Sequence, residues 1–103
     1  MYKLIATYKT PNNVEDFEKH YQDVHAPITK KIPNLKELRI NRVFGAPNGK
    51  PELYMVAELC FATKDDFKSA MGTKEAMESG KDLMGFAGDI VSVHFAQESV
   101  EQF

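Results

Sequence analysis

Residues 53–61 read Leu-Tyr-Met-Val-Ala-Glu-Leu-Cys-Phe, and every residue of this stretch except Glu58 is apolar or favours β structure. A short run of this kind is typical of a strand that is buried on both of its faces. Because the side chains of a strand alternate between its faces, we expect two apolar rows. The rows are Leu53, Met55, Ala57, Leu59 and Phe61 on one face, and Tyr54, Val56 and Cys60 on the other.

Three further segments show the alternation of bulky and polar residues that is typical of a half-buried strand. Clusters of turn-forming residues follow two of them, Thr-Pro-Asn-Asn at 10–13 and Gly-Ala-Pro-Asn-Gly at 45–49. The sequence therefore predicts strands at Tyr2–Tyr8, Lys36–Phe44 and Asp89–Ala96.

The first of two helical regions begins near Asn13, whose side chain can accept a free N–H group of the first turn. Pro27 lacks an N–H group, and its ring clashes with the carbonyl group four residues earlier. We therefore expect the helix to end or kink at Pro27. Apolar residues recur in it at spacings of three and four, which predicts a stripe that faces the core. The stripe consists of Val14, Phe17, Tyr21, Val24 and Ile28.

The second helical region opens at Thr63, which can form a variant of the capping box with Asp66. Gly72-Thr73 interrupts the helical pattern, and Gly85 and Gly88 break it again. The sequence therefore predicts two consecutive short helices.

The predicted order of elements is βαββαβ. With right-handed crossovers this order gives an α+β, ferredoxin-like fold, in which helices cover one face of a four-stranded antiparallel sheet. We expect residues 1–103 to form a single domain of this class. The third strand is apolar on both faces, yet the helices can cover only one. A second copy of the same sheet is the simplest cover for the other face, so the sequence predicts a homodimer with a barrel-like core.

Composition argues against several classes of partner. The formal net charge of −2 and the mixing of lysines with acidic residues leave no basic stripe, so we expect no binding to nucleic acid. No apolar stretch approaches about 18 residues, and the N-terminus lacks the plan of a secretion signal. We therefore expect no membrane span and a cytoplasmic location. Cys60 is the only cysteine, which excludes an internal disulfide and fits a small core residue.

His25 is the main candidate for chemistry. It precedes Ala26-Pro27 at the predicted end of the first helix, about 60° from the centre of the apolar stripe. A half-buried histidine at a helix end can titrate near neutral pH, which suits a general base, a general acid or a donor to an oxyanion. The alternative is that His25 only caps the last carbonyl groups or satisfies a buried polar group. Tyr21, one turn earlier, is its predicted neighbour.

Other side chains are further candidates for the same site. His94 lies inside the predicted last strand, where it needs a hydrogen-bond partner if it is buried; the alternative interpretation is a core histidine whose hydrogen bonds are satisfied. Tyr8 and Tyr54 can line a pocket or only pack. Glu58 could orient a histidine, pair with an arginine of the second strand or lie in a dimer interface.

Metal ions and cofactors find little support in the sequence. His20 and His25 are five residues apart, roughly 140° around an α-helix rather than on one face. We therefore expect His20 to face solvent and no metal to be bound. The sequence contains no glycine-rich phosphate loop, dinucleotide fingerprint or serine nucleophile elbow, so we expect no cofactor.

Residues 21–28, Tyr-Gln-Asp-Val-His-Ala-Pro-Ile, resemble the signature that ends the first helix in the EthD family, within the dimeric α/β-barrel superfamily. Residues 57–61 resemble the third strand of that family, with Cys60 where a large aromatic residue is common. The resemblance spans the whole chain. It implies a homodimer with a cleft between helices and sheet that holds a small, mostly apolar molecule. Of the candidate residues, His25 and its neighbour Tyr21 match the family pattern.

The leading hypothesis is a small-molecule enzyme in which His25 moves a proton on a phenolic or carbonyl compound. Tyr21, His94 or another tyrosine would polarise the oxygen of that compound. Removal of a phenolic proton gives an electron-rich species that can be oxidised, lose carbon dioxide or cyclise without a cofactor, and the superfamily includes such oxygenases, decarboxylases and cyclases. The alternatives are a non-catalytic ligand-binding or accessory dimer in a degradation pathway, and an assembly unit whose side chains fill the cleft.

Overall fold

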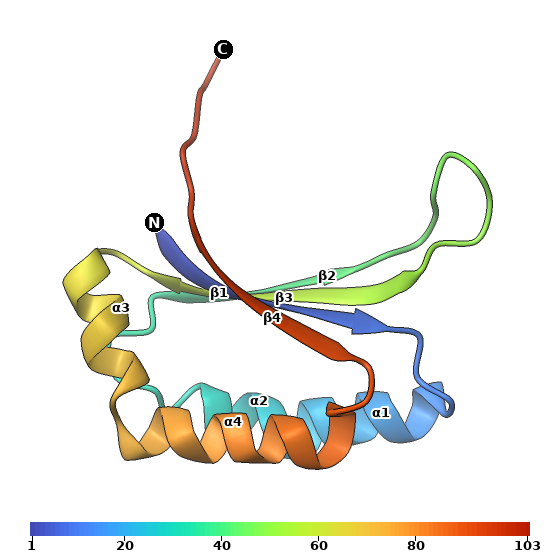
Figure 1. Cartoon of the computed structure of the whole chain (residues 1–103), viewed down its shortest axis with the longest axis horizontal. Helices are drawn as coiled ribbons and strands as arrows, with labels where there is room; N and C mark the ends of the chain where they lie inside the picture. Colours follow the sequence, from blue (N-terminus) through green and yellow to red (C-terminus); the bar gives the residue numbers. More distant parts are fainter.

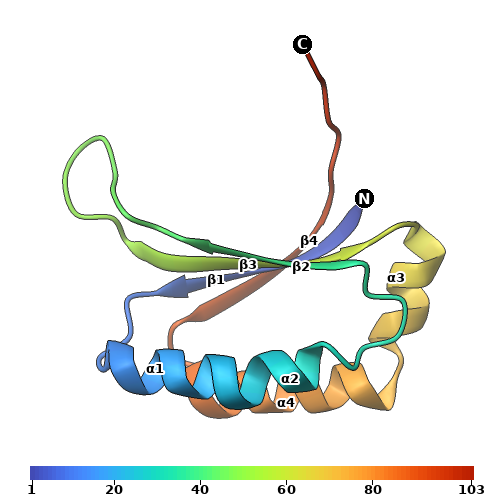
Figure 2. The same cartoon turned by 180° about the vertical axis from the view of Figure 1, so that it is seen from behind.

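A computed structural model describes all residues, 1–103, and has the predicted order of elements. The four strands form one antiparallel sheet in the order β2-β3-β1-β4, which confirms the ferredoxin-like α+β fold. All helices lie on one face of the sheet, and the other face is open (Figure 1, Figure 2). The elements are β1 (Tyr2–Lys9), α1 (Val14–His20), the π-helical turn η1 (Tyr21–His25), α2 (Ala26–Thr29), β2 (Glu37–Arg42), β3 (Leu53–Phe61), α3 (Lys64–Met71), α4 (Lys74–Ala87) and β4 (Val91–Gln97).

The central strands β1 and β3 divide the sheet into a helix-covered face and an open face. Ala6, Tyr8, Met55 and Ala57 point toward the helices and are at most 3% exposed, as the predicted alternation requires. Tyr54 departs from that alternation. It is the extra residue at the point where the pairing of β1 with β3 shifts register, and its ring packs edge-on against the aromatic ring of Phe17 in α1. The core therefore lies between the sheet and the helices.

The first helical region does not end at Pro27. In η1 the N–H group of Ala26 donates to the carbonyl oxygen of Tyr21, five residues earlier, and α2 continues to Thr29. This wider turn opens the hydrogen-bond ladder just before Pro27, which then lies in the first turn of α2, where a missing N–H group costs little. Of the two expected outcomes, an end or a kink at Pro27, the end was wrong, because the π turn accommodates the proline.

The π turn also changes which side chains of this region face the core. An extra residue in a turn rotates all later residues around the helix axis, so the predicted α-helical stripe does not continue beyond the π turn. Phe17 and Tyr21 are buried as predicted, whereas Val24 in the π turn is 39% exposed; Val14, which precedes the turn, is also 40% exposed. Most of the buried side chains are instead spaced by four residues, namely Phe17, Tyr21, His25 and Thr29, and Ala26 is buried next to His25.

The second helical region forms two helices, as predicted. The side chain of Thr63 accepts a hydrogen bond from the backbone N–H of Asp66 and begins α3, and Thr73 caps α4 in the same way. Gly85 does not break the pattern, because α4 continues through it to Ala87. Buried contacts of the helix with the sheet outweigh the poor helix propensity of a single glycine.

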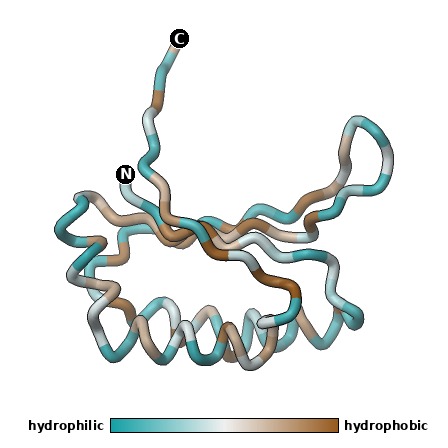
Figure 3. The backbone as a smooth tube through the Cα atoms, in the orientation of Figure 1, coloured by the Kyte–Doolittle hydropathy of each residue, from teal (hydrophilic) through white to brown (hydrophobic).

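Hydrophobic residues gather along the strands of the sheet, whereas the connection between β2 and β3 is mostly hydrophilic (Figure 3). Cys60 is a free thiol and is fully buried, as a small packed residue should be. None of the helices has the length and apolar character needed to span a membrane.

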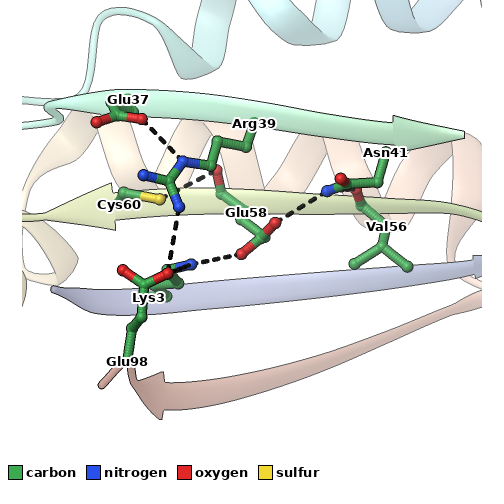
Figure 4. A network of polar contacts seen from close by, with 8 residues as sticks. All are labelled: Lys3, Glu37, Arg39, Asn41, Val56, Glu58, Cys60 and Glu98. Atoms are coloured by element: carbon green, nitrogen blue, oxygen red, sulfur yellow. Dashed lines mark hydrogen bonds and ion pairs between the residues drawn. The ribbon is translucent and has the colours of Figure 1, made fainter. Parts of the chain in front are cut away.

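An ionic network covers part of the open face (Figure 4). The Lys3 ammonium donates to Glu58 at 2.6 Å and to Glu98 at 2.9 Å, and Lys3 is only 5% exposed. Arg39 donates to Glu37 at 2.8 Å and to Glu98 at 3.3 Å. The bond with Glu58 raises the pKa of Lys3 above its ordinary value, and the same bond lowers the pKa of Glu58.

Candidate functional site

His25 lies at the end of η1 and faces the sheet. It is 6% exposed, so it is buried rather than half-buried as the sequence suggested. Its ring centroid is 5.5 Å from that of Tyr21 and 5.1 Å from that of Phe86. Burial lowers the pKa of His25 because the imidazolium loses its hydration, and a hydrogen bond with Asp82 partly offsets this effect. At neutral pH the ring is therefore mostly uncharged.

Asp82 of α4 joins His25 to His20. Its Oδ2 atom lies 3.0 Å from Nδ1 of His25, and both of its oxygens contact Nε2 of His20, at 3.0 and 3.1 Å. The π turn makes this possible, because it brings two histidines five residues apart to one side of the helix. His20 also stacks on Phe86 at 4.3 Å between ring centroids, and its side chain is 34% exposed. The expectation that His20 simply faces solvent assumed an α-helical turn and was wrong.

The second ring nitrogen of His25 lies beside a buried pair of hydroxyl groups. Its Nε2 atom is 3.4 Å from Oγ1 of Thr29, which is 2.7 Å from Oγ of Ser79. Thr29 is 2% exposed and Ser79 is 7% exposed. Because a hydroxyl group both donates and accepts, this pair can present either function to a third polar group.

A cavity of about 70 Å³ separates the helices from the sheet at this point. His25, Thr29 and Ser79 form a polar corner of its wall, and ten of its fourteen lining residues are hydrophobic. This volume is less than half of the roughly 150 Å³ of an apolar cavity that holds benzene. A ring-sized ligand therefore requires lining side chains such as Met71 and Leu83 to move, and the thioether chain of methionine adapts readily.

Tyr8 and Tyr21, two of the predicted tyrosines, line the same cavity. They are 1% and 3% exposed, and their ring centroids lie 6.2 Å apart in an edge-to-face arrangement. Burial raises the pKa of Tyr21 to about 12 and raises that of Tyr8 as well. Both phenols therefore stay protonated near neutral pH and are able to donate a hydrogen bond to an oxygen in the cavity.

Tyr54 belongs to a separate cluster. Its hydroxyl group donates to Glu18, which also accepts from Nε and Nη2 of Arg42 at 2.8 and 2.6 Å. The Arg42 guanidinium is the main reason why the pKa of Glu18 falls to about 2, with the Tyr54 bond adding to the effect. This cluster ties α1 to β2 and β3, and Tyr54 does not line the cavity.

His94 and Glu58 lie on the open face of the sheet, away from His25. Both are cross-strand partners of Ile5, which points away from the helices. His94 is exposed, and Glu58 is paired with Lys3 rather than with an arginine. The sheet separates these two candidates from the cavity, so the structure brings together His25, Tyr21 and Tyr8 only.

No group of three or more histidine, cysteine, aspartate and glutamate side chains is arranged to hold a metal ion. The nitrogens of His20 and His25 lie 3.0 Å from the carboxylate of Asp82. These are the distances of hydrogen bonds between the rings and the carboxylate.

Sequence reasoning missed Asp82, Thr29 and Ser79. Asp82 is 57 residues from His25, and no local pattern links the two. A weak signal for Thr29 existed, because it follows His25 by four residues and would share its face if the helix continued past Pro27. For Ser79 the signal was its position four residues before Leu83, on the apolar side of α4.

Residues 9–89 of this chain match the model of the EthD domain. The crystal structure of an EthD family protein from Bacillus halodurans C-125 has a TM-score of 0.92 and 37% sequence identity, and the match covers 96% of this chain and 99% of that one. An uncharacterised 11.0 kDa protein from the thcB-thcC intergenic region of Rhodococcus erythropolis is 26% identical over 98 residues, 95% of each chain.

More distant structures share the fold. SnoaB from Streptomyces nogalater, described as a cofactor-independent oxygenase, has a TM-score of 0.69 at 11% identity over 97% of this chain and 94% of its own. A dimeric ferredoxin-like protein of unknown function from Jannaschia sp. CCS1 has a TM-score of 0.64 at 13% identity over 94% of this chain and 97% of its own. At these identities the likeness concerns the fold alone.

Proposed function

Because this chain belongs to the EthD family, we propose that it binds a small, mostly apolar phenolic or carbonyl compound and that His25 exchanges a proton with it. The observation that carries this proposal is the polar corner of the cavity. There His25, Thr29 and Ser79 interrupt a wall that is otherwise mostly apolar. A cavity of this kind suits a ligand with an apolar body and one oxygen.

The geometry favours His25 as a base. Its Nδ1 side faces the carboxylate of Asp82, so Nε2 is the nitrogen available to a ligand. In the proposed step Nε2 takes a proton from a phenolic O–H or from a carbon beside a carbonyl, and the electron pair remains on the ligand as a phenolate or enolate. Asp82 stabilises the imidazolium that forms, and Tyr21 or Tyr8 donates a hydrogen bond to the ligand oxygen.

The anion formed in this way opens three classes of reaction. It can be oxidised by dioxygen, lose carbon dioxide or cyclise, and in each class the proton on His25 returns to product or solvent. Oxidation has the additional support that SnoaB, which shares the fold, is described as a cofactor-independent oxygenase.

The proposed assembly is a homodimer that covers the open face of the sheet. The partly buried side chains of Ile5 and Val56 give this face apolar surface near its centre. Lys3 already has two carboxylate partners, so covering it would leave no unpaired charge. The Jannaschia protein, which shares the fold, is described as dimeric, and this supports the proposal of a dimer.

The first test is a thermal-shift screen of the wild-type protein against phenols, quinones, β-keto acids and short aromatic polyketides, followed by product analysis of the hits under air and under nitrogen. His25→Gln removes the base and keeps a polar side chain of similar size, and His94→Gln is the matched change on the open face. We expect hits that His25→Gln weakens, and turnover that it abolishes, with no effect of His94→Gln.

Two results would contradict the proposal. If none of the compounds stabilises the wild-type protein, the cavity is not a binding site for this class. If hits stabilise it equally in the His25→Gln variant and are not converted, the protein is a carrier and His25 has no role in proton transfer.

A further inference from the structure

Asp82 is held between two imidazole rings that approach it from one side of the first helical region. The His25 nitrogen meets one carboxylate oxygen at 3.0 Å, and the His20 nitrogen meets both oxygens at 3.0 and 3.1 Å. The side chains of His25 and Asp82 are 7% and 19% exposed, whereas that of His20 is 34% exposed. The three side chains thus run from the cavity toward solvent.

We infer that Asp82 and His20 are positioning residues for His25: Asp82 holds the His25 ring as the Nδ1–H tautomer, and His20 holds Asp82. This inference deepens the proposed function and rests on it for its meaning in catalysis. Its structural content, the tautomer and its two supports, stands in the protein without any ligand.

The tautomer follows from the chemistry of the partners. An ionised carboxylate only accepts hydrogen bonds, so the His25 nitrogen that faces Asp82 must carry the hydrogen. In the neutral ring Nε2 then has a free electron pair, and it lies toward the hydroxyl group of Thr29 at 3.4 Å. A ring of the opposite tautomer would place an electron pair against the carboxylate and a hydrogen toward the cavity.

The role of His20 follows from its contact with both carboxylate oxygens. A carboxylate bound by one ring can rotate about its bond to the chain, whereas a second donor that spans both oxygens restricts this rotation. His20 is itself held by stacking on Phe86. Because η1 widens the helix between His20 and His25, the same local feature that buries His25 also brings its second support into place.

The test is ¹⁵N NMR of histidine-labelled protein, titrated with acid in the presence of a chelator so that no adventitious metal occupies a ring nitrogen. In the wild-type protein we expect neutral His25 with a protonated Nδ1 and an unprotonated Nε2. Asp82→Ala should make the tautomers mix and should lower the pKa of His25 by about one unit or more, the usual effect of removing an opposite charge at this distance. Asp82→Asn keeps the size of the side chain and serves if Asp82→Ala does not fold.

The matched control for Asp82 is Glu78→Ala, which removes the same charge from an exposed position of the same helix. We expect it to leave the tautomer and the pKa of His25 almost unchanged. The inference is overturned if wild-type His25 has its hydrogen on Nε2, if Asp82→Ala changes neither property, or if Glu78→Ala changes them as much.

The role of His20 is tested by the exchange of the His25 Nδ1–H hydrogen with water. His20→Ala should speed this exchange several-fold while the tautomer persists. His20→Gln, whose amide can still donate to Asp82, should restore most of the protection, and His94→Ala should have no effect. If the Nδ1–H hydrogen of His25 exchanges at the same rate in His20→Ala as in the wild-type protein, His20 is not a positioning residue. Because no ligand is used, these results are independent of the thermal-shift screen.

Discussion

The two faces of the sheet each bury an ionisable side chain, and they do so in opposite ways. Under the helices, His25 lies among aromatic rings, and burial lowers its pKa so that the neutral ring dominates. On the open face, Lys3 is buried to a similar extent, but hydrogen bonds to two carboxylates raise its pKa. The comparison shows that the balance between burial and charged partners decides which protonation state a fold retains: burial outweighs the single bond of His25 to Asp82, whereas two carboxylates outweigh the burial of Lys3.

The largest effect should come from the helix-covered face. Phe17 is 5% exposed and packs against the rings of Tyr8, Tyr54 and Phe86 at 5.3, 5.7 and 5.6 Å. Phe17→Ala should lower the free energy of unfolding by about 3–5 kcal/mol, as measured by urea denaturation. Phe95→Ala is the control, because Phe95 is 67% exposed. Equal losses in the two variants would mean that the core does not lie where the structure places it.

The open face should respond to a charge that has no partner. Ile5→Lys places a new ammonium at the centre of this face, where an unpaired charge in a dimer interface costs several kcal/mol. We expect a dimer for the wild-type protein and a folded monomer for the variant in light scattering after size-exclusion chromatography. Met77→Lys, at a residue that is 73% exposed on α4, should leave the dimer intact. A wild-type monomer would rule out the proposed assembly.

Much of this comparison could be predicted from the sequence. The alternation in residues 53–61 placed Met55 and Ala57 on one face of the strand, and the order of elements predicted a sheet with one open face; the structure shows that Met55 and Ala57 face the helices. The position of His94 could not be predicted, because the strand that carries it has bulky residues on both faces and only the register with Ile5 decides which face is covered.

The candidate site was predicted in part. His25 and Tyr21 were found through a local motif, but the π turn that buries His25 was not. Such a turn gains its stability from packing against the sheet and α4 and leaves no periodicity of its own. Asp82 was missed for the same reason, since only the tertiary fold brings it to His25.

Removal of Lys3 should have a smaller effect than removal of the aromatic core. Lys3→Met leaves Glu58 and Glu98 without their shared cation, which should cost about 1–3 kcal/mol. Urea denaturation measures the free energy of unfolding of this variant, of Glu58→Gln and of the double variant. The three values give the coupling free energy between Lys3 and Glu58. We expect the double variant to lose less than the sum of the single ones. Strict additivity would show that the two side chains do not interact in solution.

The smallest effect concerns the pH dependence of stability. Because the pKa of folded His25 lies below its ordinary value of 6.5, the unfolded chain binds this proton more readily. The contribution of His25 to stability is therefore complete above about pH 6.5 and declines as the pH falls toward the lowered value. Denaturation between pH 7 and pH 5 should show a decline that His25→Gln reduces. An identical decline in the variant would mean that folding does not perturb His25.

The central claim is that the ligand site lies under the helices, at His25, and not on the open face. Titration of ¹⁵N-labelled protein with phenol, the simplest compound of the proposed class, tests it most directly. We predict shifts of the amide signals of Thr29, Ser79 and Leu83 that weaken in His25→Gln, with none at Ile5. Shifts confined to the open face, or no shifts at saturating phenol, would contradict the account.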